Sequence, residues 1–276
     1  MELIIILKAI VMGIIEGVTE LLPISSTGHL IIAADLMNFL ENEKRDLFGV
    51  FIQMGATLAI VWEYRKKLFG GLFELNRPGP ARNLYVNVTV AFLPAAIVGV
   101  IFSEIILGVL FTPYVVATTF ILGGVLMIWI ERKAYQPRVH DVDGMGFGDA
   151  LKIGLCQILS LVPGTSRSGA TIIGGMFFGL SRRAATEFSF FLAIPMISGA
   201  SLYSLYSARH LLDWNDGGIL AIGFFTAFVV TLFVMRALLA FVSRYTYEVF
   251  AWYRIAFGAL ILLTAYTGWV DWSSKM

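Results

Sequence analysis

The sequence has a single cysteine, few charged residues and no recognisable leader. Cys156 lies in an apolar stretch, and one cysteine excludes an internal disulfide. Only 14% of the 276 residues are Asp, Glu, Lys or Arg, and a net charge of +1 gives no indication of a nucleic-acid partner. The first residues lack a basic segment and an Ala-x-Ala cleavage site, so we expect no removable signal peptide.

Apolar residues dominate what is present. They make up 58% of the chain, and the mean hydropathy is +0.81, a value that no ordinary soluble domain of this length would have. The composition therefore predicts an all-α, polytopic membrane protein forming one integral membrane domain over residues 1–276. Six stretches are apolar enough to cross about 30 Å of hydrocarbon. They are roughly 48–63, 84–107, 113–131, 188–207, 219–243 and 250–270.

Two further apolar regions, at about 1–40 and 149–182, are each broken by a polar segment. Both segments place a proline before a hydroxyl-rich, glycine-containing turn, and aligning Pro23 with Pro163 puts Ser26 on Ser166. Irregular backbone at membrane depth is tolerated only where protein or a water-filled cavity surrounds it. We therefore expect two re-entrant helical hairpins.

The basic residues orient these hairpins. Four loops carry 14 of the 20 lysines and arginines, which makes that side cytoplasmic by the positive-inside rule. Threading six spans through these loops puts the first hairpin outside and the second inside, which predicts inverted-topology repeats over 1–131 and 149–270 that share a midplane site. Three loops hold Arg65, Lys66, Lys67, Arg77, Arg82, Arg132, Lys133, Arg138, Lys152, Arg182 and Arg183, and Arg236, Arg244 and Arg254 surround the fourth. Those expected outside are Lys8, Lys44, Arg45, Arg209 and Lys275.

The first polar segment carries acid, base and hydroxyl groups. Glu16 and Glu20 are four residues apart and share one helix face, where two like charges need a cation, a shared proton or donors between them. The pair suits capture of Mg²⁺ or Ca²⁺, general acid–base work, or simply a solvated vestibule. Ser26 and His29 also share a face, and a serine needs such a neighbouring base to act as a nucleophile. His29 is the only histidine in the apolar body, because His140 and His210 fall in polar loops.

The second polar segment has the features of an anion site. Gly164 permits a tight backbone, and Thr165 or Ser166 can cap a half-helix whose free N–H groups would face an anion. Arg167 adds a planar fork that matches two phosphate oxygens, and Ser168 and Thr171 supply further donors. Together the two segments predict a membrane-embedded protein that transfers phosphoryl groups or handles phospholipids.

These residues resemble a known family. Glu16-Gly-Val-Thr-Glu20, the following Leu-Pro-Ile-Ser-Ser-Thr-Gly-His29 and the segment Pro163-Gly-Thr-Ser-Arg-Ser-Gly-Ala-Thr171 are similar to the motifs of the bacterial undecaprenyl-diphosphate phosphatase family, the UppP or BacA type linked to bacitracin resistance. The segment from Glu187 to Pro195 also resembles that family's pattern.

The resemblance implies a hydrolase of the bacterial cytoplasmic membrane that converts undecaprenyl diphosphate to undecaprenyl phosphate. This reaction recycles the lipid carrier of cell-wall glycan precursors, including those of peptidoglycan, at a site that opens to the extracytoplasmic face. A divalent cation, Mg²⁺ or Ca²⁺, is expected on Glu16 and Glu20, and a homodimer is left open. The implied catalytic residues are Glu16, Glu20, Ser26, His29, Ser166, Arg167 and Thr171. The substrate phosphates are expected to contact Ser25, Thr27, Gly164, Thr165, Ser166, Arg167 and Ser168.

A mechanism follows as a hypothesis. Ser26 attacks the terminal phosphorus, Arg167 and the half-helix at Ser166 neutralise the developing charge, and His29 transfers protons. In a rival assignment water attacks directly and Ser26 is only a ligand.

Two other protein classes share some of these sequence features. Lipid phosphatases with a histidine nucleophile need a histidine shortly after the Ser-Arg pair, and residue 173 is isoleucine, so that class is excluded. A flippase or anion transporter built on inverted repeats is the remaining alternative.

Overall fold

The computed structural model describes residues 3–133, 136–207, 209, 217–270 and 272. Within these ranges the chain is helical, and the only β-type pairing is an isolated bridge between Val139 and Leu180. His210 and Lys275 lie outside the described residues. The helices are α1 (Leu3–Thr19), α2 (Ser26–Leu36), α3 (Asn42–Glu63), α4 (Arg65–Leu72), α5 (Pro80–Ile105), α6 (Pro113–Arg132), α7 (Phe147–Gln157), α8 (Arg167–Phe177), α9 (Arg182–Ser207), α10 (Gly217–Val242) and α11 (Glu248–Thr267).

In the described part of the chain, six helices are long and apolar enough to cross a membrane, as the hydropathy predicts. They are α3, α5, α6, α9, α10 and α11. The two largest differences in their bounds are at α3 and α9, which begin six residues before the expected 48 and 188. Hydropathy misses these polar first turns. In that of α3 the buried Arg45 guanidinium donates hydrogen bonds to the carbonyls of Phe39 and Leu40.

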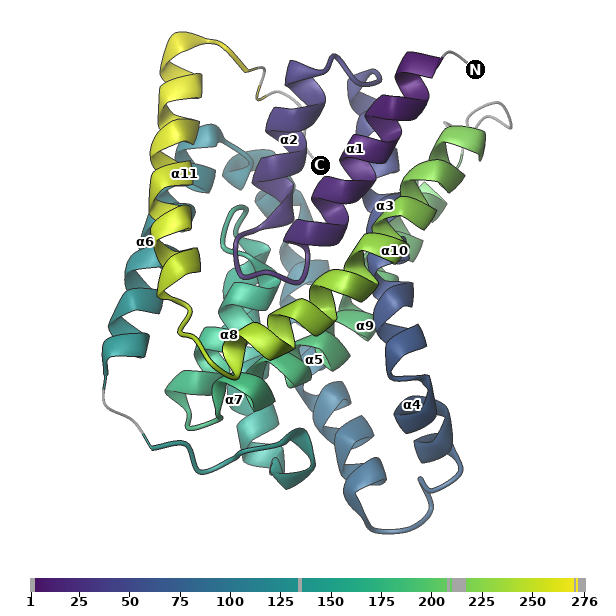
Figure 1. The fold of residues 1–276 in the computed structure, drawn as a ribbon, viewed down its shortest axis with the longest axis vertical. Coiled ribbons are helices and arrows are strands. Elements are labelled where there is room, and N and C mark those ends of the chain that lie inside the picture. The colour runs from purple at the N-terminus through teal and green to yellow at the C-terminus, as the bar shows by residue number, and fades with distance from the viewer. Residues whose placement is uncertain (1–2, 134–135, 208, 210–216, 271, 273–276) are drawn as a thin grey trace.

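The two interrupted regions form two broken helix pairs. The first is α1 followed by α2, and the second is α7, a short 3₁₀ turn over 158–161, and α8. The second helix of each pair has 11 residues and is therefore about 16 Å long, roughly half of the hydrocarbon thickness. Figure 1 shows α1 and α2 in the upper half of the molecule and α7 and α8 in the lower half.

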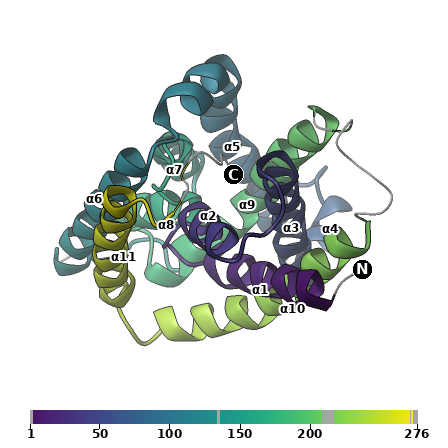
Figure 2. The ribbon, with the colours of Figure 1, turned by 90° about the horizontal axis from the view of Figure 1, so that it is seen from above.

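Helices that are distant in the sequence hold the broken pairs in place. The helix α10 packs along both α1 and α3, while α5 packs along α7, and α6 pairs with α11. Seen from above, α10 runs beneath α1 along one edge of the bundle, and α6 and α11 stand side by side at another edge (Figure 2). The contact of α1 with α10 depends on small residues. A Cβ atom on Gly13 would lie 2.6 Å from the carbonyl oxygen of Gly223.

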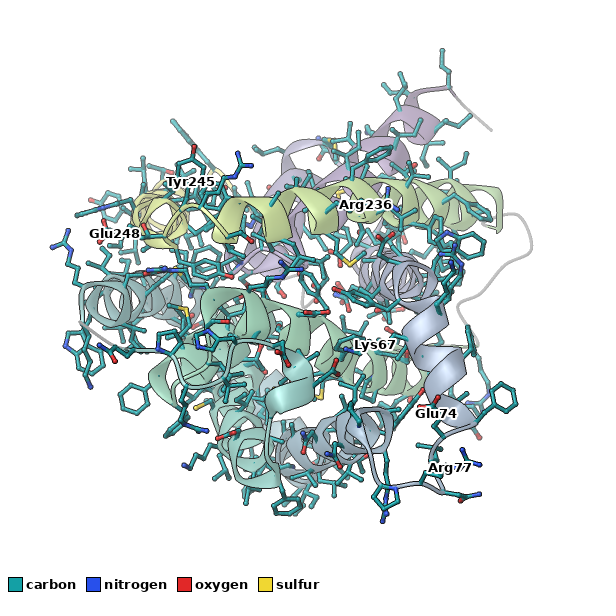
Figure 3. The ribbon with its side chains drawn as sticks, turned by 60° about the horizontal axis from the view of Figure 1, so that its bottom comes forward. Lys67, Glu74, Arg77, Arg236, Tyr245 and Glu248 are labelled. Atoms are coloured by element: carbon teal, nitrogen blue, oxygen red, sulfur yellow. The ribbon has the colours of Figure 1, made fainter. Side chains whose placement is uncertain are left out.

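Charged residues gather at the end of the bundle that carries α4. Lys67 pairs with Asp143 at 2.8 Å, and Arg236 pairs with Glu63 at 2.6 Å. Figure 3, in which the bottom of Figure 1 comes forward, has Lys67 close to the middle of this end and Arg236 on the helix above it. Arg254, expected beside the fourth basic loop and within the span 250–270, lies in the buried interior of the bundle. The helix α11 begins at Glu248, so Arg254 lies almost two turns inside it and is only 1% exposed.

We expect replacement of Gly13 by alanine to destabilise the protein. The added methyl group would lie 2.6 Å from the Gly223 carbonyl oxygen and 2.8 Å from Thr226 Cβ, and such overpacking typically costs about 1–3 kcal/mol. Thermal unfolding in detergent, followed by tryptophan fluorescence, measures the loss. Gly199→Ala is the matched control, because its added Cβ meets no atom within 4 Å. Equal unfolding temperatures for the two variants would contradict the close crossing of α1 and α10.

Candidate functional site

The two broken helix pairs turn back through the same unusual backbone conformation. Ser25 precedes α2 with φ 66° and ψ 107°, and Ser166 precedes α8 with φ 72° and ψ 116°. Non-glycine residues with positive φ are strained and persist where the surrounding structure holds them, commonly at functional sites. The turns therefore form a matched pair of strained corners.

This match shifts the sequence alignment by one residue. Alignment on the two prolines places Ser26 on Ser166, but the structure gives Ser25 the position and dihedral angles of Ser166. The second turn has one residue more between its proline and its helix, a difference that an ungapped alignment cannot show. Ser26 is consequently the counterpart of Arg167, since each is the first residue of its helix.

A cavity of about 240 Å³ lies between the two turns. Beside the predicted residues it is lined by polar groups that sequence reasoning missed, including Gln53 on α3 and Ser160 in the 3₁₀ turn. Phe111 and Met196 form part of its apolar wall. The predicted residues in the lining are Glu20, Ser25, Ser26, Thr27, Gly164, Ser166 and Arg167.

Glu20 joins the two halves of this cavity. Ser26 Oγ donates a hydrogen bond to Glu20 Oε2 at 2.7 Å, and Arg167 Nη2 donates to Glu20 Oε1 at 2.9 Å. The Glu20 and Arg167 side chains are only 10% and 11% exposed, so water screens this ion pair weakly. A hydroxyl, a carboxylate and a guanidinium from three separate segments thus form one connected group.

Arg167 is held from behind by α9. Its Nη1 donates to the carbonyl oxygen of Ser189 at 2.8 Å, and Thr171 Oγ1 donates to Ser189 Oγ at 2.8 Å. Thr171 Oγ1 also lies 3.0 Å from the Arg167 carbonyl oxygen, but it reaches the guanidinium only through Ser189, and Thr171 does not belong to the described lining of the cavity. Ser189 was not predicted, although it lies in the segment from Glu187 to Pro195 that carries part of the family resemblance.

Two polar groups beside the cavity have no hydrogen-bond partner among the described residues. They are the Arg167 Nε–H and both carboxylate oxygens of Glu16, which is fully buried. Leaving a buried polar group unpaired costs about 1–3 kcal/mol, and more for a charged group, so such atoms commonly face a ligand. The arginine N–H suits an anion oxygen, and the carboxylate suits a cation or a proton.

Glu16 and Glu20 fit a weakly ligated divalent cation. The described residues contain no cluster of three or more His, Cys, Asp and Glu that could enclose a metal ion by itself. Mg²⁺ is usually bound by one or two carboxylates together with substrate phosphates and water, so a pair of glutamates is sufficient. The unpaired oxygens of Glu16 are the observation that favours such an ion.

His29 faces away from the cavity. Its Nδ1 lies 2.7 Å from the Ser25 carbonyl oxygen, its Nε2 lies 2.5 Å from the Tyr253 hydroxyl, and its ring stacks on Phe257 at 4.1 Å. Both ring nitrogens are thus engaged, and His29 is not among the described residues that line the cavity. The structure brings it against α11 and not against Ser26 Oγ.

Two further predicted residues, Ser168 and Thr165, do not line the cavity between the turns among the described residues. Ser168 Oγ donates to the Leu22 carbonyl oxygen at 2.9 Å and so ties the second turn to the end of the first. Thr165 lines a separate, largely apolar cavity of about 280 Å³ between α6 and α8.

Arg254 connects both turns to the bundle. Its Nη1 donates to the Pro23 carbonyl oxygen at 3.0 Å, and its Nη2 donates to the Gly164 carbonyl oxygen at 3.1 Å. Two further bonds reach the carbonyl oxygens of Thr119 and Phe120 on α6. Arginine in an apolar helix is itself a signal of function. The sequence reasoning missed it because Arg254 is close to a polar loop.

The chain is similar to known proteins along nearly its whole length. Residues 9–260 match the family model described as bacitracin resistance protein BacA. The chain belongs to the BacA family. An undecaprenyl-diphosphatase of Cellvibrio japonicus is 65% identical over 99% of this chain and all of its own length. Undecaprenyl-diphosphatase 1 of Chromobacterium violaceum is 54% identical over 96% of this chain and 98% of its own, and undecaprenyl-diphosphatase 2 of Rhodospirillum rubrum is 53% identical over 99% and 100%.

In this BacA-family protein we expect Arg254→Lys to lower thermal stability strongly. A lysine ammonium cannot reach four carbonyl oxygens that the guanidinium fork reaches, and each buried acceptor left unpaired costs about 1–3 kcal/mol. Thermal unfolding of the purified protein measures the effect. Arg244→Lys, at an exposed position of the loop before α11, is the control and should unfold like the unaltered protein. An Arg254→Lys variant as stable as this control would argue against the carbonyl contacts.

Proposed function

We propose that the protein hydrolyses undecaprenyl diphosphate to undecaprenyl phosphate and inorganic phosphate, and so recycles the lipid carrier of cell-wall glycan synthesis. Near-full-length relatives at 53–65% identity carry the name undecaprenyl-diphosphatase. The observation that carries the proposal is the connected group of Ser26, Glu20 and Arg167 at one cavity. It combines a nucleophile, a base and a phosphate-binding cation.

The hydrogen bond from Ser26 to Glu20 favours this glutamate as the general base. Glu20 takes the hydroxyl proton while Ser26 Oγ bonds to the terminal phosphorus, and the bond from that phosphorus to the bridging oxygen breaks to release undecaprenyl phosphate. Water then cleaves the phosphoserine and releases inorganic phosphate. The free Arg167 Nε–H and the N-terminal N–H groups of α8 stabilise the charge on the transferring group.

Glu16 and Glu20 would hold the divalent cation, Mg²⁺ or Ca²⁺, that the sequence leads us to expect. Such an ion would offset the negative charge of the diphosphate. The proton-transfer role predicted for His29 stays a prediction. The contacts of its two nitrogens with Ser25 and Tyr253 do not place either nitrogen at Ser26. The homodimer also stays a prediction.

The arrangement of the helices supports inverted repeats with two re-entrant hairpins, over 1–131 and 149–270. The helix α1 packs on α10 as α7 packs on α5, and both broken pairs turn at a serine of positive φ. A reciprocal pair of contacts adds to this. Thr119, the seventh residue of α6, donates to the Pro163 carbonyl oxygen at 2.7 Å, and Arg254, the seventh residue of α11, donates to that of Pro23.

The protein is a multi-pass membrane protein, and we place it in the bacterial cytoplasmic membrane with its site open to the extracytoplasmic side. The ion-paired end that contains Lys67 and Arg236 would face the cytoplasm. The helix α9 begins at Arg182 beside that end, and it lines the cavity with Met196 and Ala200 from its second half. The cavity is therefore displaced from the basic end.

A flippase or anion transporter is the second candidate, since inverted repeats with broken helices are typical of transporters. A carrier has no need of a serine hydroxyl bonded to a carboxylate. The Ser26–Glu20 contact therefore favours the hydrolase.

Phosphate release from an isoprenyl diphosphate in detergent tests the proposed activity. We expect Ser26→Ala and Glu20→Gln to lower kcat about 10²–10⁴-fold, since they remove the nucleophile and the base. Ser243→Ala, at an exposed position, is the control. A phosphoserine trapped in a slowed variant such as Arg167→Lys would support attack by Ser26, and its absence would favour attack by water. Lipid exchange across vesicles without phosphate release from the intact protein would favour the carrier.

Removal of divalent cations by a chelator should abolish phosphate release, and added Mg²⁺ or Ca²⁺ should restore it. We expect Glu16→Gln to raise the cation concentration needed for half-maximal activity about 10-fold or more, because it removes one of two carboxylates. A titration of activity against metal concentration measures this shift. An unchanged requirement in Glu16→Gln would exclude Glu16 as a ligand, and full activity in chelator would exclude the cation altogether.

A further inference from the structure

Tyr253 is a partly exposed tyrosine of α11 whose hydroxyl group has a defined partner. Its side chain is 41% exposed, and its hydroxyl lies 2.5 Å from His29 Nε2. The two rings lie almost parallel, with an interplanar angle of 8°. Because the hydrocarbon of a membrane offers no water to a hydroxyl group, the hydrogen bond to His29 satisfies the Tyr253 hydroxyl where water would not.

The contact with Ser25 fixes which nitrogen of His29 carries the proton. A carbonyl oxygen only accepts hydrogen bonds, so Nδ1, 2.7 Å from the Ser25 carbonyl, must be the donor. In the neutral ring Nε2 is then an acceptor, and the Tyr253 hydroxyl donates to it. Stacking on Phe257 at 4.1 Å holds the ring in this orientation.

Ser25 is the residue that needs this support. It has a φ of 66°, and its own side chain makes no capping hydrogen bond to α2. Ser166, its counterpart, has a φ of 72° but is held locally, since its Oγ accepts a hydrogen bond from the Gly169 N–H at 3.1 Å. The second turn is restrained by a hydrogen bond to its own serine side chain. The first turn is restrained instead by His29, which lies outside the turn and donates to the Ser25 carbonyl.

Ser25 directly precedes Ser26, whose hydroxyl donates to Glu20. A change in the peptide between them would turn Ser26 Oγ away from the carboxylate. We propose that Tyr253 is a positioning residue for the diphosphatase reaction, on which this inference rests: its hydroxyl donates to Nε2 and so holds the His29 ring against the Ser25 carbonyl, which aims Ser26 at Glu20.

Tyr253→Phe removes only the hydroxyl group and is the first test. We expect kcat for phosphate release to fall about 10-fold with KM changed less than about 2-fold, because a small misplacement of a nucleophile lowers the rate more than it lowers binding. Tyr266→Phe, on the same helix and 89% exposed, is the matched control and should behave like the unaltered protein. An unchanged kcat in Tyr253→Phe would overturn the proposal.

His29→Asn distinguishes positioning from proton transfer. An asparagine amide nitrogen can take the place of Nδ1 and donate to the Ser25 carbonyl. Asparagine has no atom in the place of Nε2, however, and so loses the contact with Tyr253. We therefore expect His29→Asn to keep at least about a tenth of the activity, and Tyr253→Phe to have no further effect in that background. Additive losses would overturn the proposal, and so would complete loss in His29→Asn, which would instead support proton transfer by His29.

The tautomer itself can be measured without turnover. The chain has three histidines, so His140→Gln and His210→Gln leave only His29 for nitrogen NMR of the ¹⁵N-histidine-labelled protein. We expect a single tautomer protonated at Nδ1, and an Nε2 resonance that moves toward that of an unbonded acceptor nitrogen once Tyr253→Phe is added. A starting protein protonated at Nε2, or an Nε2 resonance that Tyr253→Phe leaves unmoved, would overturn the proposal. If the intact protein released no phosphate, the diphosphatase activity would fail while this measurement still decided the role of Tyr253.

Discussion

The fold depends on donors for the backbone carbonyls where two helices break inside the membrane. Each break frees backbone carbonyl oxygens, and a buried one left unpaired would make the broken helix unstable. Arg254 satisfies Pro23 and Gly164, one from each turn, and Thr119 satisfies Pro163. Because α6 and α11 supply these donors and pack on each other, one helix pair fixes both turns relative to each other.

This support from behind leaves the front of each turn free for chemistry. With the carbonyls occupied, the hydroxyls and the first N–H groups of α2 and α8 can face the cavity. In the proposed mechanism the equivalent first residues differ in function, since Ser26 would supply the nucleophile and Arg167 a permanent charge. Glu20 contacts both, so the carboxylate that would activate the serine also fixes the arginine. The two turns thus contribute complementary halves of one site.

The sequence predicts those features that are local. Six spans follow from continuous apolar stretches, and the two turns stand out because Pro-Ser segments with a glutamate or an arginine are costly in lipid. Features that depend on contacts between distant segments are not local. Arg254 falls within the span expected at 250–270, but the sequence does not show that its guanidinium reaches both turns. The one-residue offset between the turns likewise requires their dihedral angles. Ser189 and Tyr253 are ordinary in sequence, and they become relevant only through partners far along the chain.

Glu16 and His29, both predicted as catalytic, differ in whether their polar atoms have hydrogen-bond partners in the protein. Both ring nitrogens of His29 have protein partners and its ring is stacked on aromatic side chains, as expected of a group that holds structure. Glu16 is fully buried with both carboxylate oxygens unpaired among the described residues. Since a folded protein seldom leaves a buried carboxylate without a partner, the missing partner of Glu16 is a cation, or a proton that Glu16 would share with the neighbouring Glu20. The chemistry is accordingly concentrated where Glu16, Glu20 and Arg167 meet, and His29 serves the nucleophile from a distance.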